Sequence, residues 1–285
     1  MKHDRFRTLS LLLVIAFATP ALLHASVTIS NTDFTYSQDF NSLPTANNET
    51  LVWTDNETLP GWYRRSNVSN AVQTDNPNLV DWSAQGSNIG DPRFYNASTA
   101  GTSDRAVGFL IDGGELTKGS VGVVFTNNTG LTITGFDLGY RGEQWYRYID
   151  AVTTLNFEYA VVNSFATDIN GDIDRVQPGT WTGVSALSWT VEADGNTTFT
   201  NGTTAGFSEV FAPVTLSGLS IADGQDLVIR WSIAETNEHQ NGLFIDDVTF
   251  GNVTAIPEPS TYAVITGLLM FSFVMYRRKR AQHVA

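Results

Sequence analysis

The sequence predicts an all-β protein, a jelly-roll-type β-sandwich of about ten strands, flanked by an amino-terminal signal helix and a carboxyl-terminal transmembrane helix. Between residues 26 and 254 the chain is rich in Thr, Asn, Gly and aromatic residues. β-Branched and aromatic side chains suit pleated strands, and Asn and Gly suit the turns between them. Short apolar alternations separated by Gly- and Asn-containing turns recur along this region, so we assign residues 26–254 to one sandwich domain.

Residues 1–25 have the organisation of a secretory signal peptide. Three basic residues precede an apolar run from Leu9 to Leu23, and the small residue Ala25 follows. This order predicts export by the Sec machinery and cleavage near Ala25. An uncleaved anchor is the alternative, but the run is short for a membrane span and Pro20 interrupts it.

The exported part is strongly acidic. The whole chain has a net charge of −13, and residues 26–256 contain nine Lys and Arg against 27 Asp and Glu, a net charge of −18. Such a surface repels phosphate backbones, which argues against nucleic acid as a partner. The chain has no cysteine, and this excludes disulfides, thiol catalysis and thiolate metal sites.

Three strands show the alternation most clearly. In residues 131–140, apolar side chains alternate with a slip at Gly135, and residues 154–162 and 226–234 alternate without one. A period of two places alternate residues on one face of a strand. We expect Leu227, Ile229 and Trp231 to share a buried face. Residues 41–91 are less regular and predict loops or an edge elaboration.

Aromatic pairs beside charged residues predict a glycan-binding platform. Trp62 and Tyr63 lie in "LPGWYRR", and Trp145 and Tyr146 lie in "RGEQWYRY". Flat aromatic faces can stack on sugar rings, and neither pair lies in a regular strand pattern. The alternative is packing in the core or in loops, because large aromatic side chains are usually buried.

An Asp-rich segment predicts a calcium loop. Asp168, Asn170, Asp172 and Asp174 alternate around Gly171, and oxygen ligands in such a tight loop suit Ca²⁺. A solvated turn rich in Asp and Asn is the alternative reading, because the downstream Glu of the helical calcium loop is missing.

No catalytic constellation stands out, so we predict a protein that is not an enzyme. His239 is the one histidine within residues 26–256, which excludes a multi-histidine metal centre. The alternative is a secreted hydrolase of the glycosidase type that uses paired carboxylates such as Glu143 and Asp150. It requires two carboxylates about 5–10 Å apart in a cleft.

The carboxyl-terminal segment 255–281 combines three features: the tripeptide Pro257, Glu258, Pro259; a short apolar run from Tyr262 to Tyr276; and the basic cluster Arg277, Arg278, Lys279, Arg280. Fifteen helical residues cover about 22 Å, less than the ~30 Å hydrocarbon core of a bilayer.

The segment resembles the PEP-CTERM sorting signal of Gram-negative bacteria. That resemblance implies transient membrane insertion, recognition by an exosortase, cleavage near Pro-Glu-Pro, and release to the cell surface or the exopolysaccharide matrix of a biofilm.

The body carries a second resemblance. The segment "FIDDV", residues 244–248, is similar to the closing strand of jelly-roll carbohydrate-binding modules, and stretches from Tyr36 to Phe250 resemble a unit that recurs among PEP-CTERM proteins. The first similarity implies a structural calcium held by Asp246 or Asp247, with an acidic residue such as Asp39. A β-bulge or a polar pair on an edge strand would explain the motif equally well.

Overall fold

The computed structural model describes residues 26–44, 50–68, 78–83, 93–99, 102–114, 116–168, 173 and 180–282. The predicted signal peptide, residues 1–25, lies outside these residues. Asn170, Asp172 and Asp174 of the predicted calcium loop also lie outside them.

Sixteen strands form in the described part of the chain, six of them only two or three residues long. The strands are β1 (Val27–Ile29), β2 (Tyr36–Gln38), β3 (Thr50–Val52), β4 (Trp62–Val68), β5 (Asn78–Ser83), β6 (Arg93–Ser98), β7 (Ala106–Leu110), β8 (Leu116–Asn127), β9 (Leu131–Arg147), β10 (Thr153–Val162), β11 (Thr182–Gly183), β12 (Trp189–Val191), β13 (Thr198–Phe199), β14 (Ser208–Ile221), β15 (Asp226–Ile233) and β16 (Gly242–Pro257). The helices are α1 (Phe165–Asp168), the 3₁₀ turn η1 (Ser185–Leu187) and α2 (Pro259–Gln282).

The strands make two sheets, which confirms the predicted β-sandwich. One sheet has the order β1-β8-β15-β10-β11, with β4 and β12 added at its sides, and the other has the order β13-β9-β16-β7-β6-β5-β3, with β14 and β2 added. Successive long strands alternate between the sheets: β7, β9, β14 and β16 lie in the second, and β8, β10 and β15 in the first. This alternation gives the sandwich its jelly-roll-like character.

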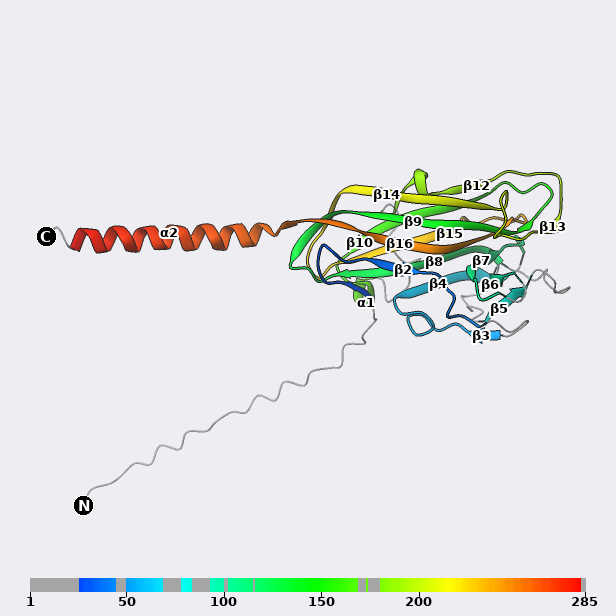
Figure 1. Ribbon diagram of the computed structural model, residues 1–285, viewed down its shortest axis with the longest axis horizontal. Coiled ribbons are helices and arrows are strands. Elements are labelled where there is room, and N and C mark those ends of the chain that lie inside the picture. The colour runs from blue at the N-terminus through cyan, green and yellow to red at the C-terminus, as the bar shows by residue number, and fades with distance from the viewer. Residues whose placement is uncertain are drawn as a thin grey trace, which may run out of the picture.

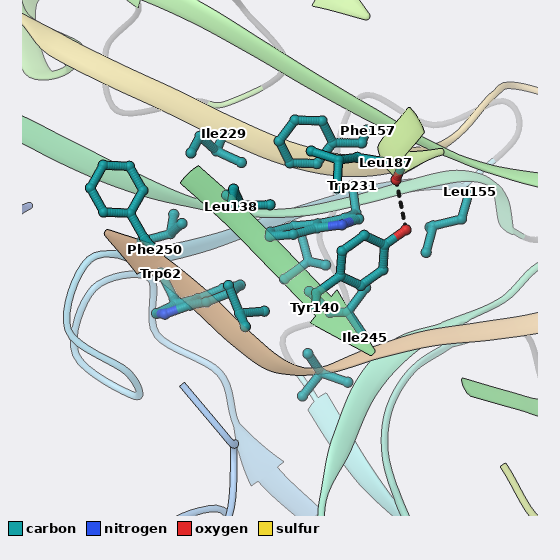
Figure 2. Close-up of a cluster of buried hydrophobic side chains, with 14 of the residues drawn as sticks. Trp62, Leu138, Tyr140, Leu155, Phe157, Leu187, Ile229, Trp231, Ile245 and Phe250 are labelled. Atoms are coloured by element: carbon teal, nitrogen blue, oxygen red, sulfur yellow. Dashed lines mark hydrogen bonds between the residues drawn. The ribbon is translucent and has the colours of Figure 1, made fainter. Parts of the chain in front are cut away.

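The core between the sheets combines aromatic rings with Leu, Ile and Val side chains (Figure 2). The rings of Trp62 and Trp231 stack with centroids 6.1 Å apart and an interplanar angle of 10°. The Tyr140 ring lies edge-on to Trp231, and its buried hydroxyl donates a 2.7 Å hydrogen bond to the Leu187 carbonyl. The polar end of this core tyrosine therefore keeps a partner, as burial requires.

The predicted alternations are confirmed. Leu227, Ile229 and Trp231 are fully buried in the core, and the slip at Gly135 coincides with irregular pairing between β9 and both of its neighbours. The strand count exceeds the prediction because strands of two or three residues are too short to show a period. In the less regular region, β4 pairs with β8 over its whole length.

Two smaller clusters lie on the outer faces of the sheets. Against the β8–β15–β10 sheet, Tyr63 and Val228 pack with Phe165 of α1. Against the β9–β16–β7 sheet, Trp145 and Phe244 pack with residues of β6 and β7. Each outer face is thus covered in one part.

The helix α2 forms where the sequence predicts one and extends away from the end of the sandwich (Figure 1). Within the described residues no helix combines the length and the apolarity needed to cross a membrane. The predicted transmembrane helix is therefore not supported. The apolar run from Tyr262 to Tyr276 is too short, because the basic cluster follows it directly.

Candidate functional site

The predicted aromatic platform is wrong for the first pair. Trp62 is fully buried and donates a 2.7 Å hydrogen bond from its indole N–H to the Tyr36 hydroxyl. Tyr63 is 1% exposed on the opposite face of the same strand and packs edge-on against Phe165. Because β4 pairs with β8, these side chains point alternately into the main core and into the smaller outer cluster, and neither offers a face to a ligand.

For the second pair, the prediction of an exposed aromatic face is wrong at Trp145 for the same reason, burial. Its side chain is fully buried, and its indole N–H donates a 2.8 Å hydrogen bond to Glu143 Oε2. Gly202 lies against the indole so closely that a Cβ there would come within 2.5 Å of Nε1. Tyr146 is half-buried and packs near Phe199, with ring centroids 5.2 Å apart.

A β-bulge in β16 explains the "FIDDV" motif locally. Asp246 pairs with Arg141 of β9 and Thr249 pairs with Gly139, so two residues of β16 lie opposite the single residue Tyr140. Asp247, inside the bulge, has a left-handed φ of 49° and an exposed side chain. Asp246 is 1% exposed. The bulge therefore directs the two neighbouring carboxylates into different environments.

Asp246 belongs to a cluster of three carboxylates. One oxygen from each of Asp104, Glu143 and Asp246 lies within 4.8 Å of the others. Glu143 comes from β9, Asp246 from β16, and Asp104 from the segment just before β7. Because β16 pairs with both β9 and β7, it brings these three residues together at one end of the sheet.

Burial makes the cluster electrostatically costly. Desolvation raises the pKa of Glu143 to about 7, with the Trp145 hydrogen bond acting against the rise. Desolvation, followed by the neighbouring negative charge of Asp247, raises the pKa of Asp246 to about 9. Asp246 Oδ1 is buried without a hydrogen-bond partner. Carboxylates in such a place need a proton or a cation.

The cluster fits a divalent cation with oxygen ligands. Ca²⁺ binds oxygens at 2.3–2.6 Å, so two ligands of one ion lie no more than about 5 Å apart. The three carboxylate oxygens meet this condition, and the partnerless Asp246 Oδ1 provides a ligand atom that no protein group occupies. Asp104, Glu143 and Asp246 are the residues that would hold calcium. Bound calcium would supply the positive charge that the buried pair lacks.

The remaining predicted calcium ligands lie elsewhere. Asp39 is exposed, and its carboxylate accepts a 3.1 Å bond from the backbone N–H of Asn41. Asp247 is exposed and lies 3.4 Å from Arg141 Nε. Neither belongs to the cluster. Asp168 is the last residue of α1, and its side chain is outside the described residues, so the Asp-rich loop stays a prediction.

The predicted catalytic pair is separated. Glu143 lies buried in the cluster, whereas Asp150 lines a pocket of about 370 Å³ together with Tyr148, His239 and neighbouring residues. In that pocket the Tyr148 and His239 rings stack with centroids 4.4 Å apart. Glu143 has no part in this pocket, so the arrangement gives no support to a Glu143–Asp150 hydrolase.

The sorting tripeptide is joined to the sandwich. Pro257 ends β16 opposite Leu131, and Glu258 Oε1 accepts hydrogen bonds from the Thr132 hydroxyl (3.0 Å) and the Asp223 backbone N–H (3.1 Å). Pro259 begins α2. The basic residues Arg277, Arg278, Lys279 and Arg280 all lie in the last turns of this helix.

Sequence reasoning missed Asp104 as a member of the carboxylate cluster. It stands in "TSDRAVGF" with no spacing that relates it to Glu143 or Asp246. The one local signal was the acidic residue just before a buried strand. The pairing of β7 with β16, which gives that signal its meaning, cannot be read from the chain.

No protein-family model matches the chain, and no curated protein matches it. Among solved structures, it is similar to the K2 cleaved adhesin domain of Lys-gingipain, with 14% identity, a TM-score of 0.36, and coverage of 76% of this chain and 97% of that one. It is also similar to the enzymatically active domain of bacteriophage CBA120 tailspike protein 4, with 8% identity, a TM-score of 0.32, and coverage of 73% and 21%.

A third similar structure is TmCBM61 in complex with β-1,4-galactotriose, with 13% identity, a TM-score of 0.24, and coverage of 53% of this chain and 72% of that one. With all three identities at 14% or lower and all TM-scores below 0.5, the function of this chain has to be argued from its own residues.

Proposed function

We propose that this chain is an exported surface or matrix protein of a Gram-negative bacterium, stabilised by calcium and released from its carboxyl-terminal tail by an exosortase. Its amino-terminal signal directs it to the Sec machinery, and the mature sandwich associates with exopolysaccharide. It acts by binding rather than by catalysis. The observation that carries the proposal is the exposed apolar helix α2 at the end of an otherwise well-packed sandwich.

The exposure of α2 is unusual for a folded protein. Leu268, Leu269 and Phe271 are 61–66% exposed, and the other large apolar side chains described in this helix are also exposed. An apolar surface of this size marks contact with a membrane or partner. A segment that associates transiently with the membrane and is then removed satisfies that requirement.

The junction limits where the tail can be cut. A protease needs an accessible strand, but Pro257 is still paired with β9 and Glu258 is held by Thr132 and Asp223. The Glu258–Pro259 peptide bond is the first that follows these contacts. We therefore expect cleavage at this bond or beyond it.

Calcium has a structural role in this proposal. Asp104, Glu143 and Asp246 connect the start of β7 to β16 and β9. A cation bound to all three neutralises the buried pair and links these segments where no disulfide is present. Such a metal would stabilise the exported domain in a medium that contains calcium.

Mass spectrometry of the protein recovered from the cell surface or the medium tests the sorting. We expect a mature carboxyl terminus at or just after Glu258, without the basic cluster. As a matched comparison, Glu258→Gln keeps the shape of the side chain but changes the tripeptide, and we expect it to retain the tail. An intact tail through Arg280 in surface material from the unaltered chain would refute the proposal.

A further inference from the structure

The part of the β8–β15–β10 sheet that α1 leaves open carries a polar surface. Outward-facing residues of neighbouring strands form rows across the sheet, because Ser232 pairs with both Ser120 and Asn156, and Arg230 pairs with both Gly122 and Glu158. Along β15 the alternate residues Ile229 and Trp231 point into the core. Arg230 and Ser232 are therefore fixed on the outer face by the strand period.

An ion pair lies at the centre of this surface. Glu158 Oε2 accepts bonds from Arg230 Nε at 2.9 Å and from the Ser232 hydroxyl at 3.2 Å, and Arg230 Nη2 lies 2.8 Å from the same oxygen. The Arg230 guanidinium also lies 3.9 Å from the centre of the Trp181 ring. These contacts hold both charged groups in fixed positions.

The contacts leave hydrogen-bonding capacity unused. Among the described residues, every contact of Glu158 ends on Oε2, so Oε1 is available as an acceptor. Asn156 donates to the Ser232 carbonyl at 3.3 Å through its amide nitrogen, and in the described part of the chain its side-chain oxygen has no hydrogen bond. Asn156 and Glu158 are alternate residues on one face of β10, and both are partly exposed.

The surface is hollowed into a groove. One pocket of about 460 Å³ is lined by Lys118, Ser120, Arg230 and their neighbours, and a second of about 460 Å³ is lined by Thr154, Ser188 and theirs. Asn156 and Glu158 line both pockets. The two hollows therefore adjoin at Asn156 and Glu158, and we call the pair of hollows the outer groove.

The chemistry of the outer groove selects its ligand. Two cationic side chains, Lys118 and Arg230, are matched by two carboxylates, Glu158 and Glu235, so the lining has no net charge. Its hydroxyl, amide and carboxylate groups suit a ligand with many hydroxyls. An anionic polymer would be repelled by the protein, because residues 26–256 carry a net charge of −18.

We propose that the outer groove binds a segment of a neutral polysaccharide, with Glu158 and Asn156 accepting hydrogen bonds from sugar hydroxyls. This rests on the proposed function as a matrix protein and adds the binding site and the ligand class. An extended peptide would need unused backbone groups for pairing. β15 is paired on both sides, and at the edge of β10 the backbone of Phe157 is already bonded to the Ser188 hydroxyl and the Val184 N–H.

Affinity electrophoresis of the purified full-length protein tests the inference. The neutral probes are laminarin, dextran and β-1,4-galactan, and the anionic probes are alginate and polygalacturonate. We expect retardation by at least one neutral probe and none by the anionic probes. Absence of retardation by every neutral probe, or stronger retardation by an anionic one, would overturn the proposal.

Two variants locate the site. Glu158→Gln removes the charge but not the shape, and Asn156→Ala removes the second acceptor without touching the ion pair. We expect each to weaken binding about tenfold, the effect of losing one hydrogen bond to a charged or well-placed group. Glu209→Gln, an exposed position on β14 in the other sheet, is the matched control and should bind as the unaltered chain does.

The two proposals fail separately. If the chain is trimmed at its carboxyl terminus but is not retarded by a neutral polysaccharide, the proposal of sugar binding in the outer groove is refuted and the sorting proposal stands. If the chain is retarded but keeps its carboxyl-terminal tail, the sorting proposal is refuted and the proposal of sugar binding in the outer groove stands. Unchanged affinity in both Glu158→Gln and Asn156→Ala, with normal melting temperatures, would show that sugar binds elsewhere and overturn the inference.

Discussion

The two outer faces of the sandwich treat buried or half-buried carboxylates in opposite ways. On the β9–β16–β7 face, Glu143 and Asp246 are 1–2% exposed and desolvated, so their pKa values are raised. On the β8–β15–β10 face, the half-buried Glu158 receives the guanidinium of Arg230. Glu143 and Asp246 therefore need a cation or protons from solution, whereas Glu158 is paired with a neighbouring arginine. The positive charge available to each carboxylate, more than the residue type, decides whether it is ionised and whether it can bind a cation.

The largest effect we expect concerns the core that separates the two faces. Trp62→Ala should reduce the free energy of unfolding by about 3–5 kcal/mol, because a fully buried indole leaves a cavity. Urea denaturation measures this. Tyr146→Ala, at a half-buried position, should cost clearly less. If the Trp62→Ala protein had normal stability and had lost only sugar binding, the prediction that Trp62 belongs to a glycan-binding platform would be supported after all.

Removal of divalent cations should have the next largest effect, on the carboxylate cluster. A ligand at a hundred times its Kd stabilises the folded state by about 2.7 kcal/mol, so chelation should lower the melting temperature by roughly 5–10 °C. Differential scanning calorimetry with EDTA and then excess calcium measures it. The same loss should appear in Asp246→Asn with calcium present, whereas Asp247→Asn, at the exposed neighbour, should melt normally. Identical melting with and without EDTA would contradict the metal centre.

The pH dependence of the cation-free chain distinguishes the faces more finely. The folded-state pKa values of about 7 for Glu143 and about 9 for Asp246 lie above the unfolded values near 4. The folded chain thus binds more protons, and this contribution to stability declines as pH rises from about 4 through 9. Urea titrations in EDTA should show the decline, and Asp246→Asn should flatten it. Stability that rose over this window in the unaltered chain and was unaffected by Asp246→Asn would count against the buried cluster.

The smallest effect should come from Glu158→Gln, and the same substitution at Glu143 on the other face provides the comparison. Without divalent cations near pH 8, Glu143→Gln removes a buried charge and should stabilise the chain. Glu158→Gln weakens a half-exposed ion pair and should destabilise it by no more than about 1 kcal/mol. In parallel urea titrations, changes of opposite sign in the free energy of unfolding would support the contrast between the two faces. Changes of the same sign would contradict it.

The sequence located the sandwich better than the site. Strand alternation in residues 226–234 was enough to identify Leu227, Ile229 and Trp231 as core, because side-chain direction follows from position in a strand. The prediction failed at Trp62 and Trp145, which we expected to be exposed because charged residues flank them and no regular alternation includes them. Their neighbours are charged, but β4 and β9 lie within sheets whose second faces are also covered. Local charge reports little about burial when both faces of a strand are packed.

The sequence by itself determined the all-β architecture, the buried alternations and the tripartite tail, because each depends on residues near one another in the chain. The tertiary structure decided which acidic residues meet. Asp104, Glu143 and Asp246 come from distant segments and become neighbours only because β16 pairs with both β7 and β9. The structure also separated Asp246 from Asp247 through one bulge, and it matched Glu158 with Arg230 across two strands. Contacts between strands depend on register, and register is set by the packing of the whole sandwich.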